Sequence, residues 1–250
     1  MSLLRRGIIS SGKLDAGGGT TVYAANDADF DGSGDNLQQV SQTEFTIPAD
    51  KKFSFEYSIN ADSFPASAWV ASKYGTSSEY LVGFRGTSAT LIVINAAVTA
   101  NLIDINFTYT FLVSTQYHIV INSDGANARL YVNGALEQTV AHSTSAHNIS
   151  TDPFGIGARV NPSVIQAFNG RIGMLRKYNK TLSLSEVQQN YNSGDILCST
   201  SAVAGAVCDW RLANWTGTVG QELTDYGSGG HNFTNPLGIA FTAGSLSVEC

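Results

Sequence analysis

The segment Phe53–Ile59 places the strongest constraint on the fold, because apolar and polar side chains alternate along it without interruption. Aromatic or aliphatic residues occupy positions 53, 55, 57 and 59, and Ser or Glu occupies each position between them. Successive side chains of a β-strand point to opposite faces of the sheet, so this period of two predicts a strand with one buried face. Glu56 falls on the other face, where we expect a solvated side chain.

Other segments predict hairpins built from strands of the same kind. Residues 107–113 alternate again, and the apolar run 129–132 leads directly into Asn133-Gly134. Asn-Gly between apolar strands is a strong hairpin signal, because both residues of the tight turn must accept positive φ. The chain holds about a dozen such strand candidates separated by turns, which predicts an all-β antiparallel sandwich or jelly roll.

The segment 168–191 predicts a strand that leads into one short helix. Gly170 opens the strand, whose apolar positions continue to Tyr178. Ser183 precedes Glu186 by three residues, which is the spacing of a capping box at a helix N-terminus. We therefore expect a helix near 183–192 with one apolar stripe. The stripe consists of residues at i, i+3 and i+7: Leu184, Val187 and Tyr191.

Several segments, taken in order, resemble the laminin-G-like domains, which are concanavalin A-like lectin/glucanase jelly rolls. They are Phe30–Leu37, Ser72-Lys73 with Tyr80–Phe84, Tyr117–Gly134 and Phe168–Tyr191. Together they span about residues 28–193. The resemblance implies a concanavalin A-like antiparallel β-sandwich, and it names no ligand.

The ends of the chain differ from this middle part. Residues 1–20 form a Gly-rich arm, and we expect a single jelly-roll domain over 21–250. Cys208–Leu212 and Gly220–Phe233 resemble the usual beginning of the family, although they stand near the end here. We expect 208–250 to complete the sandwich as a permuted first-strand region. A truncated second repeat and an irregular tail are the alternatives.

Charge and hydropathy exclude several classes of partner. The net charge is −6, and no Lys/Arg stripe with interleaved aromatics is present, so we expect no nucleic-acid partner. No apolar run reaches the roughly 18 residues of a membrane span. Arg5-Arg6 interrupts the first apolar run, so we expect no signal peptide and synthesis in the cytoplasm.

The cysteines leave two readings open. Cys198 and Cys208 are close enough in sequence to close a short disulfide loop, or both are free thiols, and Cys250 has no obvious partner. The lack of an export signal favours free thiols.

Catalytic patterns are missing from the chain. Related glycosidases carry their two carboxylates on one strand as E-x-D-x-x-E, and no such pattern occurs here. The glutamates are isolated in sequence, and no G-x-S-x-G nucleophile elbow is present. We therefore expect a protein that is not an enzyme, with a glycoside hydrolase as the outlying alternative.

An acidic stretch resembles the start of a calcium-binding EF-hand loop, with carboxylates at Asp27, Asp29, Asp31 and Asp35. The twelfth position is Gln38 instead of the bidentate Glu, and no flanking helices are readable, so we reject an EF-hand. A looser calcium site built from these four aspartates stays a hypothesis, and we expect no required cofactor.

Sugar binding needs exposed aromatic rings, because sugars present apolar C–H faces beside their hydroxyl groups. The aromatic candidates are Trp69, Tyr74, Trp210, Trp215 and Tyr226. For each of them a place in the core is the alternative.

Two functional hypotheses follow. The first is a recognition or adhesion module that binds carbohydrate or another surface polymer. The second is a structural or assembly protein, such as a decoration or tail-associated component on a bacteriophage virion surface, with a homo-oligomer as one option. In that case an arm of apolar and basic residues would dock on a neighbouring virion protein: Leu3, Leu4, Arg5, Arg6, Ile8 and Ile9. The two hypotheses are compatible.

Overall fold

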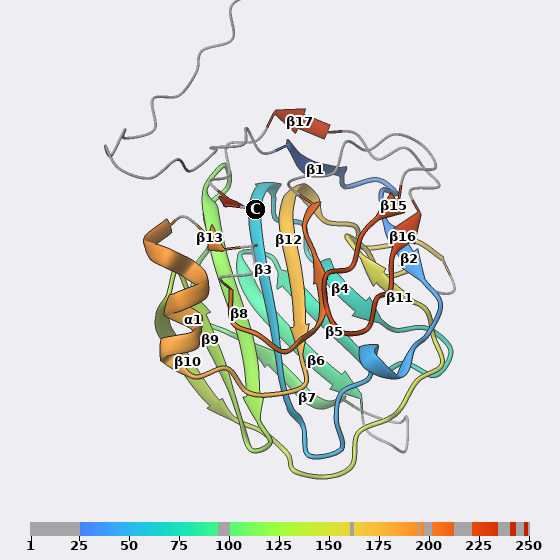
Figure 1. Ribbon diagram of the computed structural model, residues 1–250. Helices are drawn as coiled ribbons and strands as arrows, with labels where there is room; N and C mark the ends of the chain where they lie inside the picture. The colour runs from blue at the N-terminus through green and yellow to red at the C-terminus, as the bar shows by residue number, and fades with distance from the viewer. Residues whose placement is uncertain are drawn as a thin grey trace, which may run out of the picture.

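Two antiparallel sheets face each other in the computed structural model, and their inner faces form the core (Figure 1). The structure describes residues 26–94, 101–160, 163–194, 196–197, 202–212, 222–234, 241–243 and 248–249. This arrangement confirms the sandwich and the concanavalin A-like jelly roll that the sequence predicts. The N-terminal arm lies outside the described residues.

The first sheet has eight strands within the described residues. They are β1 (Asn26–Asp31), β3 (Lys52–Ser63), β8 (Gln116–Asp124), β9 (Asn127–Val132), β10 (Ala135–Ala141), β12 (Asn169–Tyr178), β14 (Ala206–Trp210) and β17 (Phe241–Ala243). The order is β10-β9-β8-β3-β12-β1-β17, and β14 also pairs with β12.

The second sheet has six described strands. They are β2 (Leu37–Gln39), β4 (Ala68–Lys73), β5 (Tyr80–Arg85), β6 (Ser88–Ile94), β7 (Asn101–Asn106) and β11 (Phe154–Ile156), in the order β2-β11-β4-β5-β6-β7. Two small pairs lie outside both sheets. In one, β13 (Ile196–Leu197) runs parallel to β18 (Val248–Glu249), and in the other β15 (Glu222–Leu223) runs antiparallel to β16 (Phe233–Thr234).

The alternating strand β3 behaves as predicted on its inner face and differently on its outer face. Phe53, Phe55, Tyr57 and Ile59 are all fully buried in the core, and the ring of Phe55 lies 5.1 Å from that of Tyr80 on β5. The expectation that the outward-facing Glu56 is solvated is wrong, because this side chain is also fully buried. The helix described next covers it.

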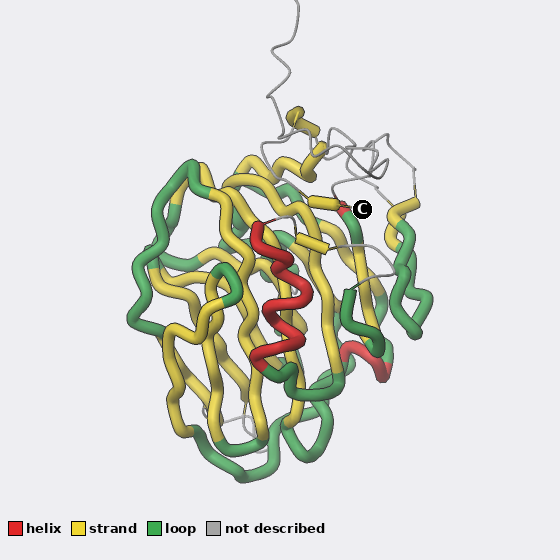
Figure 2. The backbone as a smooth tube through the Cα atoms, turned by 60° about the vertical axis from the view of Figure 1, so that its left-hand side comes forward, coloured by secondary structure: helices red, strands yellow, loops and turns green. Residues whose placement is uncertain are grey.

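The helix α1 (Leu184–Tyr191) lies across the outer face of the eight-stranded sheet (Figure 2). Ser183 and Glu186 form the predicted capping box, in which the Ser183 hydroxyl accepts from Glu186 N and Glu186 Oε2 accepts from Ser183 N at 2.8 Å. Val187 is buried as expected, but Leu184 is 45% exposed. The polar Asn190 takes the place of an apolar contact on the buried side. No helix in the described part of the chain is long and apolar enough to cross a membrane.

The residues beneath α1 form a buried polar cluster around Glu56. Its carboxylate accepts hydrogen bonds from Asn190 at 2.8 Å and Tyr178 at 3.2 Å, and it lies 2.7 Å from His118 Nε2. Burial by itself would raise the pKa of Glu56, but the charge of Arg176 and the hydrogen bonds lower it below the ordinary value.

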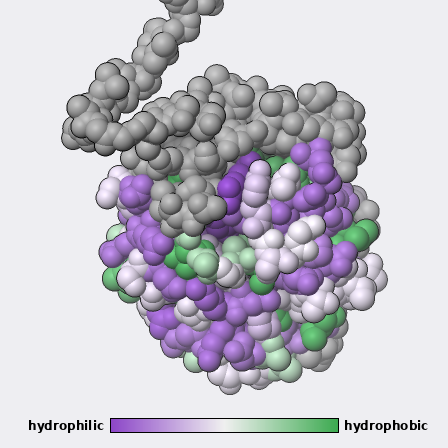
Figure 3. Space-filling model, viewed as in Figure 1, coloured by the Kyte–Doolittle hydropathy of each residue, from purple (hydrophilic) through white to green (hydrophobic). Residues whose placement is uncertain are grey.

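The sheet surface around this helix is mostly hydrophilic, with small separate apolar patches (Figure 3).

The edge of β12 is shared by strands from opposite parts of the chain. β1 pairs with Asn169–Ile172, and β14 pairs with Leu175–Tyr178 further along the same edge. β17 then pairs with β1. Two strands of the C-terminal segment, β14 and β17, therefore extend the eight-stranded sheet, while the single-domain division over 21–250 stays a prediction.

The motif after β14 builds a tight loop against that strand. The carboxylate of Asp225 accepts hydrogen bonds from the backbone N–H groups of Asp209, Gly227 and His231 at 2.7, 2.8 and 2.9 Å. Three such bonds to one charged acceptor fix the loop between the paired strands β15 and β16.

Candidate functional site

An open pocket of about 180 Å³ lies on the outer face of the six-stranded sheet. Leu81 and Ile92 point into it from β5 and β6, because the residues on either side of each face the core. The pocket is lined by Ser67, Trp69, Tyr74, Leu81, Arg85, Ile92, Asn101, Arg159 and Gln166. This lining contains both apolar side chains and hydrogen-bonding groups.

The floor of the pocket is a small apolar cluster separate from the main core. Trp69, Leu81 and Ile92 are buried together, and Tyr74 packs against them. The indole Nε1 of Trp69 donates to Gln166 Oε1 at 2.9 Å, and its backbone N–H donates to Gln166 O at 3.2 Å. These two bonds hold Gln166 at a positive φ of 55° that a non-glycine residue rarely adopts. The bond from Nε1 also fixes the plane of the indole.

Gly83 on β5 allows the close approach of β4 at the floor. A Cβ at this position would lie 2.2 Å from Ala68 O and 2.8 Å from Trp69 Cα, both of them backbone atoms. Any side chain there would push the two strands apart, so the position of Trp69 depends on this glycine.

The wall of the pocket is a stacked pair, Tyr74 and Arg159. The guanidinium carbon of Arg159 lies 4.6 Å from the centre of the Tyr74 ring, which is the geometry of a cation–π contact. Arg159 begins a tight loop, in which its backbone exchanges hydrogen bonds with Ile165 at 3.1 and 3.0 Å. The Arg159 Nε atom is buried and has no hydrogen-bond partner among the described residues.

The rim carries a second arginine that is already paired. Arg85 Nη1 lies 2.6 Å from Asp104 Oδ1, and Asn101 Nδ2 donates to Asp104 Oδ2 at 2.7 Å. Both oxygens of the Asp104 carboxylate are therefore occupied. No carboxylic acid is among the described residues that line the pocket.

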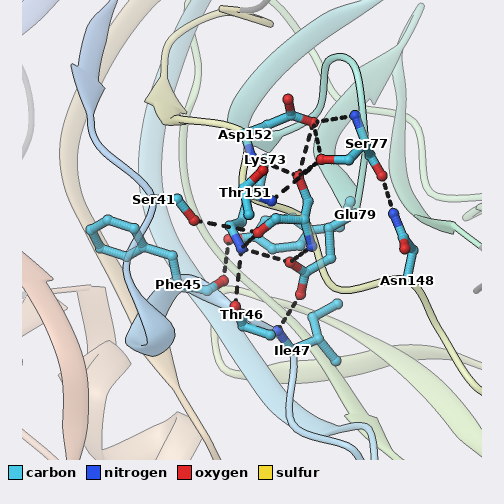
Figure 4. A network of polar contacts seen from close by, with 12 residues as sticks. Ser41, Phe45, Thr46, Ile47, Lys73, Ser77, Glu79, Asn148, Thr151 and Asp152 are labelled. Atoms are coloured by element: carbon cyan, nitrogen blue, oxygen red, sulfur yellow. Dashed lines mark hydrogen bonds and ion pairs between the residues drawn. The ribbon is translucent and has the colours of Figure 1, made fainter.

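A buried network supports the loop that carries Tyr74 (Figure 4). The carboxylate of Asp152 accepts the backbone N–H groups of Thr76, Ser77 and Ser78 at 3.1, 3.0 and 2.7 Å. Burial alone would raise the pKa of Asp152, but the Ser150 hydroxyl and these three bonds lower it below the ordinary 3.8. Asp152 thus holds the 76–78 backbone in place beside the pocket.

The same network contains an enclosed ion pair. Lys73 Nζ lies 2.8 Å from Glu79 Oε2, and neither side chain is exposed to solvent. Lys73 also donates to Thr46 Oγ1 at 3.0 Å, and Glu79 Oε1 accepts from Ile47 N at 2.6 Å. Lys73 is part of the Ser72-Lys73 segment that resembles the laminin-G-like domains. In the structure it joins the end of β4 to the 43–47 segment.

The structure describes four of the five predicted aromatic residues and brings two of them together. Trp69 and Tyr74 meet in the pocket, although Trp69 is only 2% exposed and forms the floor. The expectation that Trp210 is a binding platform is wrong. It is fully buried, with the rings of Phe154 and Phe233 at 5.3 and 4.9 Å.

The other two aromatic candidates lie elsewhere. Tyr226 is 57% exposed and does not line the pocket, and the guanidinium of Arg211 lies 4.0 Å from the centre of its ring. Trp215 lies outside the described residues, as do the six arm residues between Leu3 and Ile9. A docking role for that arm stays a prediction.

The acidic stretch runs from the strand β1 into a turn. Asp31 accepts hydrogen bonds from both the backbone and the hydroxyl of Ser33 at 2.7 Å, which lower its pKa, and Asp35 Oδ2 accepts from Asp31 N at 3.1 Å. Asp29 lies on β1, and Asp27 belongs to the same strand. Within the described residues no group of three or more His, Cys, Asp or Glu is placed to hold a metal ion. A calcium requirement stays a prediction.

The state of one thiol is clear. Cys208 is a free, buried thiol, and burial raises its pKa. Cys198 and Cys250 lie outside the described residues.

Four polar pocket residues could not be inferred from the sequence: Arg85, Asn101, Arg159 and Gln166. They come from three different segments, β5, β7 and the connection between β11 and β12, and none belongs to a local motif. The apolar run 91–94 and the segment Tyr80–Arg85 predicted two strands, but they gave no indication of a pocket on the outer face of those strands.

Comparisons with known proteins agree with the observed fold. Residues 31–188 match the family model of the concanavalin A-like lectin/glucanases superfamily. No curated protein gave a significant match.

Among solved structures, the chain resembles a protein from Bacteroides ovatus with a provisional assignment as carbohydrate binding, at a TM-score of 0.64 and 17% identity. The match covers 89% of this chain and 60% of the other, so the chain spans less than two thirds of that protein. It also resembles the CBM40 domain of the Ruminococcus gnavus IT-sialidase bound to α2,3-sialyllactose, with a TM-score of 0.53, 13% identity, and coverage of 66% and 95%. A third is the botulinum neurotoxin serotype G binding domain, with a TM-score of 0.52 and 14% identity. That match covers 66% of this chain and 42% of the other.

Proposed function

Because the chain belongs to the concanavalin A-like lectin/glucanase superfamily, we propose that it is a non-catalytic carbohydrate-binding module. Its binding site is the pocket on the outer face of the six-stranded sheet, between Tyr74 and Arg85. Recognition of a glycan or another surface polymer through this pocket is the function that the geometry supports best.

One observation carries this proposal: hydrogen-bonding side chains stand around an apolar floor on an open sheet face. Asn101, Gln166 and the two arginines offer donors and acceptors at the rim, and the floor consists of Leu81, Ile92 and Trp69. Sugars combine hydroxyl groups with apolar C–H surfaces, so a ligand with both features matches this lining. The structural neighbours that bind or are provisionally assigned to bind carbohydrate add support.

The absence of an acid from the described pocket lining supports a binding role over catalysis. Glycoside hydrolysis requires two carboxyl groups about 5–9.5 Å apart that flank the scissile bond. The nearby Asp104 is already engaged by Arg85 and Asn101. A test for reducing-sugar release from polysaccharides that bind would detect hydrolysis and would overturn this part of the proposal.

A glycan array followed by calorimetry tests the binding proposal. We expect Tyr74→Ala to weaken the binding of any glycan found on the array by about tenfold or more, because it removes one wall and releases Arg159. Tyr226→Ala is the matched control, since Tyr226 is also stacked with an arginine but lies outside the pocket. We expect it to bind like the unchanged protein.

Two outcomes would contradict the proposal. One is silence on every glycan, and the other is an equal loss of binding in both tyrosine variants. Repeating the array in EDTA tests the calcium hypothesis separately, because chelation would abolish binding only if a metal ion takes part.

A further inference from the structure

We propose that the pocket selects glycans that carry a carboxylate, such as uronic or ulosonic acids, and that Arg159 binds the carboxylate. This inference rests on the proposed carbohydrate-binding function and names its ligand class. It draws on the charge balance of the pocket, the state of Arg159 and the accessibility of the aromatic rings.

The pocket is cationic although the protein is acidic. Its described lining contains two arginines and no carboxylic acid, and Asp104 neutralises only Arg85. Two positive charges and one negative charge leave one positive charge in the described part of the site. The adjacent residues 95–100 and 161–162 contain no ionisable side chain. A single uncompensated guanidinium in a chain of net charge −6 indicates a local site for an anion.

Arg159 has no acceptor of its own in the part of the chain that the structure describes. The ion pairs there do not include it, and its side chain makes no hydrogen bond to those residues. Its Nε is also shielded from water without a partner, which is an energetic cost for a charged donor. A carboxylate that binds side-on to the guanidinium would satisfy Nε and one terminal nitrogen together.

Arg159 is also held in a fixed orientation. The Tyr74 ring lies against the guanidinium plane at 4.6 Å, and the 76–78 backbone after Tyr74 is anchored by Asp152. A planar, pre-oriented fork of donors matches the geometry of a planar carboxylate better than that of a neutral hydroxyl group. Little side-chain freedom would be lost when the ligand binds.

The aromatic rings of the pocket offer little surface for stacking with a neutral sugar. Trp69 is 2% exposed, and one face of Tyr74 is covered by Arg159. Charge-assisted hydrogen bonds are roughly twice as strong as neutral ones. A carboxylated sugar therefore uses the strongest contact that this pocket provides.

Matched acid and neutral probes test the assignment. The unchanged protein is titrated with oligogalacturonate and with its methyl ester, which has the same rings without the charge, and with other acid–neutral pairs from the array. We expect the acid form to bind at least about tenfold more tightly than its neutral partner. This comparison needs no variant, so it stands even if a substitution disturbs folding.

Variants then assign the effect to one residue. We expect Arg159→Gln to weaken binding of the acid at least about tenfold more than binding of the neutral form, so that the preference for the acid is lost, and Arg159→Lys to restore part of the preference. Arg211→Gln is the matched control, because Arg211 stacks on Tyr226 away from the pocket and should have no effect. Thermal melting verifies that each variant is folded.

The outcomes separate this inference from the proposed function. Binding restricted to neutral or sulfated glycans, or an acid preference that survives in Arg159→Gln, would overturn the carboxylate assignment and leave the carbohydrate-binding module intact. The lack of any glycan ligand would reject the proposed function itself.

Discussion

Charged side chains that are enclosed in this sandwich have specific partners. Glu56 is held by Asn190 and His118 under the helix, and Lys73 and Glu79 hold each other between the sheet and the 43–47 segment. Enclosed charges of this kind add little net stability, because their attraction is offset by the loss of water. They do make the local geometry specific, since each partner becomes costly to remove.

Removal of the Lys73 ammonium tests this directly. We expect Lys73→Met to lower the free energy of unfolding by about 3–5 kcal/mol, because it leaves the Glu79 carboxylate buried without its cation. Lys52→Met is the control, since Lys52 lies 3.9 Å from Asp50 with both side chains more than half exposed. It should change the free energy of unfolding by less than about 1 kcal/mol. Urea denaturation measures both, and equal losses would contradict the expectation.

At the level of secondary-structure elements, local signals in the sequence were sufficient where the cause was local. The alternation in β3, the Asn133-Gly134 turn and the Ser183 capping box all predicted what forms. Burial of Glu56 could not be predicted, because it depends on where α1 packs. Exposure of Leu184 has the same origin, since the polar cluster turns Asn190 toward the sheet.

The candidate site was predictable only in part for a similar reason. Aromatic residues were the candidates because sugars present apolar C–H faces, and two of these residues, Trp69 and Tyr74, do line the pocket. The position of Arg159 depends on the loop between β11 and β12, which meets β4 only in the folded sheet. Trp210 was misjudged because its indole is covered by β11 and β16, whose packing no local pattern indicates.

The shared edge of β12 leads to a prediction about the C-terminal segment. We propose that 208–250 completes the sandwich, and we expect truncation before residue 206 to destabilise the protein and cause aggregation. Removing β14 would open the β12 edge at Leu175–Tyr178 and uncover Phe154. Size-exclusion chromatography and the urea midpoint measure the effect.

A milder variant supports the interpretation of that experiment. Trp210→Ala keeps β14 and removes only the indole, so we expect a loss of about 3–5 kcal/mol in a protein that remains monodisperse. A truncated chain with the midpoint of the full protein would show that the segment is dispensable for the fold.

For the whole molecule, the helix and the proposed binding site lie on different outer faces of the sandwich. The helix α1 lies on the outer face of the eight-stranded sheet (Figure 2), and the pocket occupies the outer face of the six-stranded one. The proposed ligand site therefore depends on loops that the helix does not contact. Stability and recognition are open to separate measurement.

The titrating groups predict that the protein loses stability in acid. Burial lowers the pKa of His147 below 6.5, so the unfolded chain takes up this proton first and the free energy of unfolding falls as the pH drops through about 6.5. Carboxylates with a lowered pKa contribute stability that is present above the ordinary values of 3.8 to 4.5 and is lost as the pH falls below them. They are Asp31, Glu44, Glu56, Asp124, Asp152 and Glu186.

Melting temperatures between about pH 3 and 8 check this dependence. Asp152→Asn should flatten the acid limb, because one of the groups that releases its proton on folding is gone. Asp50→Asn is an exposed control that should leave the curve unchanged. A melting temperature that stays constant or rises toward the acid end would contradict the expected loss of stability.

The pairing of β1 with β17 also has a consequence for how the protein is made. On a ribosome, β1 emerges long before β17 and β14. The strand β12 therefore leaves the exit tunnel with part of one edge unpaired. Until β14 and β17 have been synthesised, this unpaired edge of β12 can pair with other chains and cause aggregation. We therefore expect the growing polypeptide to recruit chaperones during synthesis and to reach a protease-resistant state only near its completion.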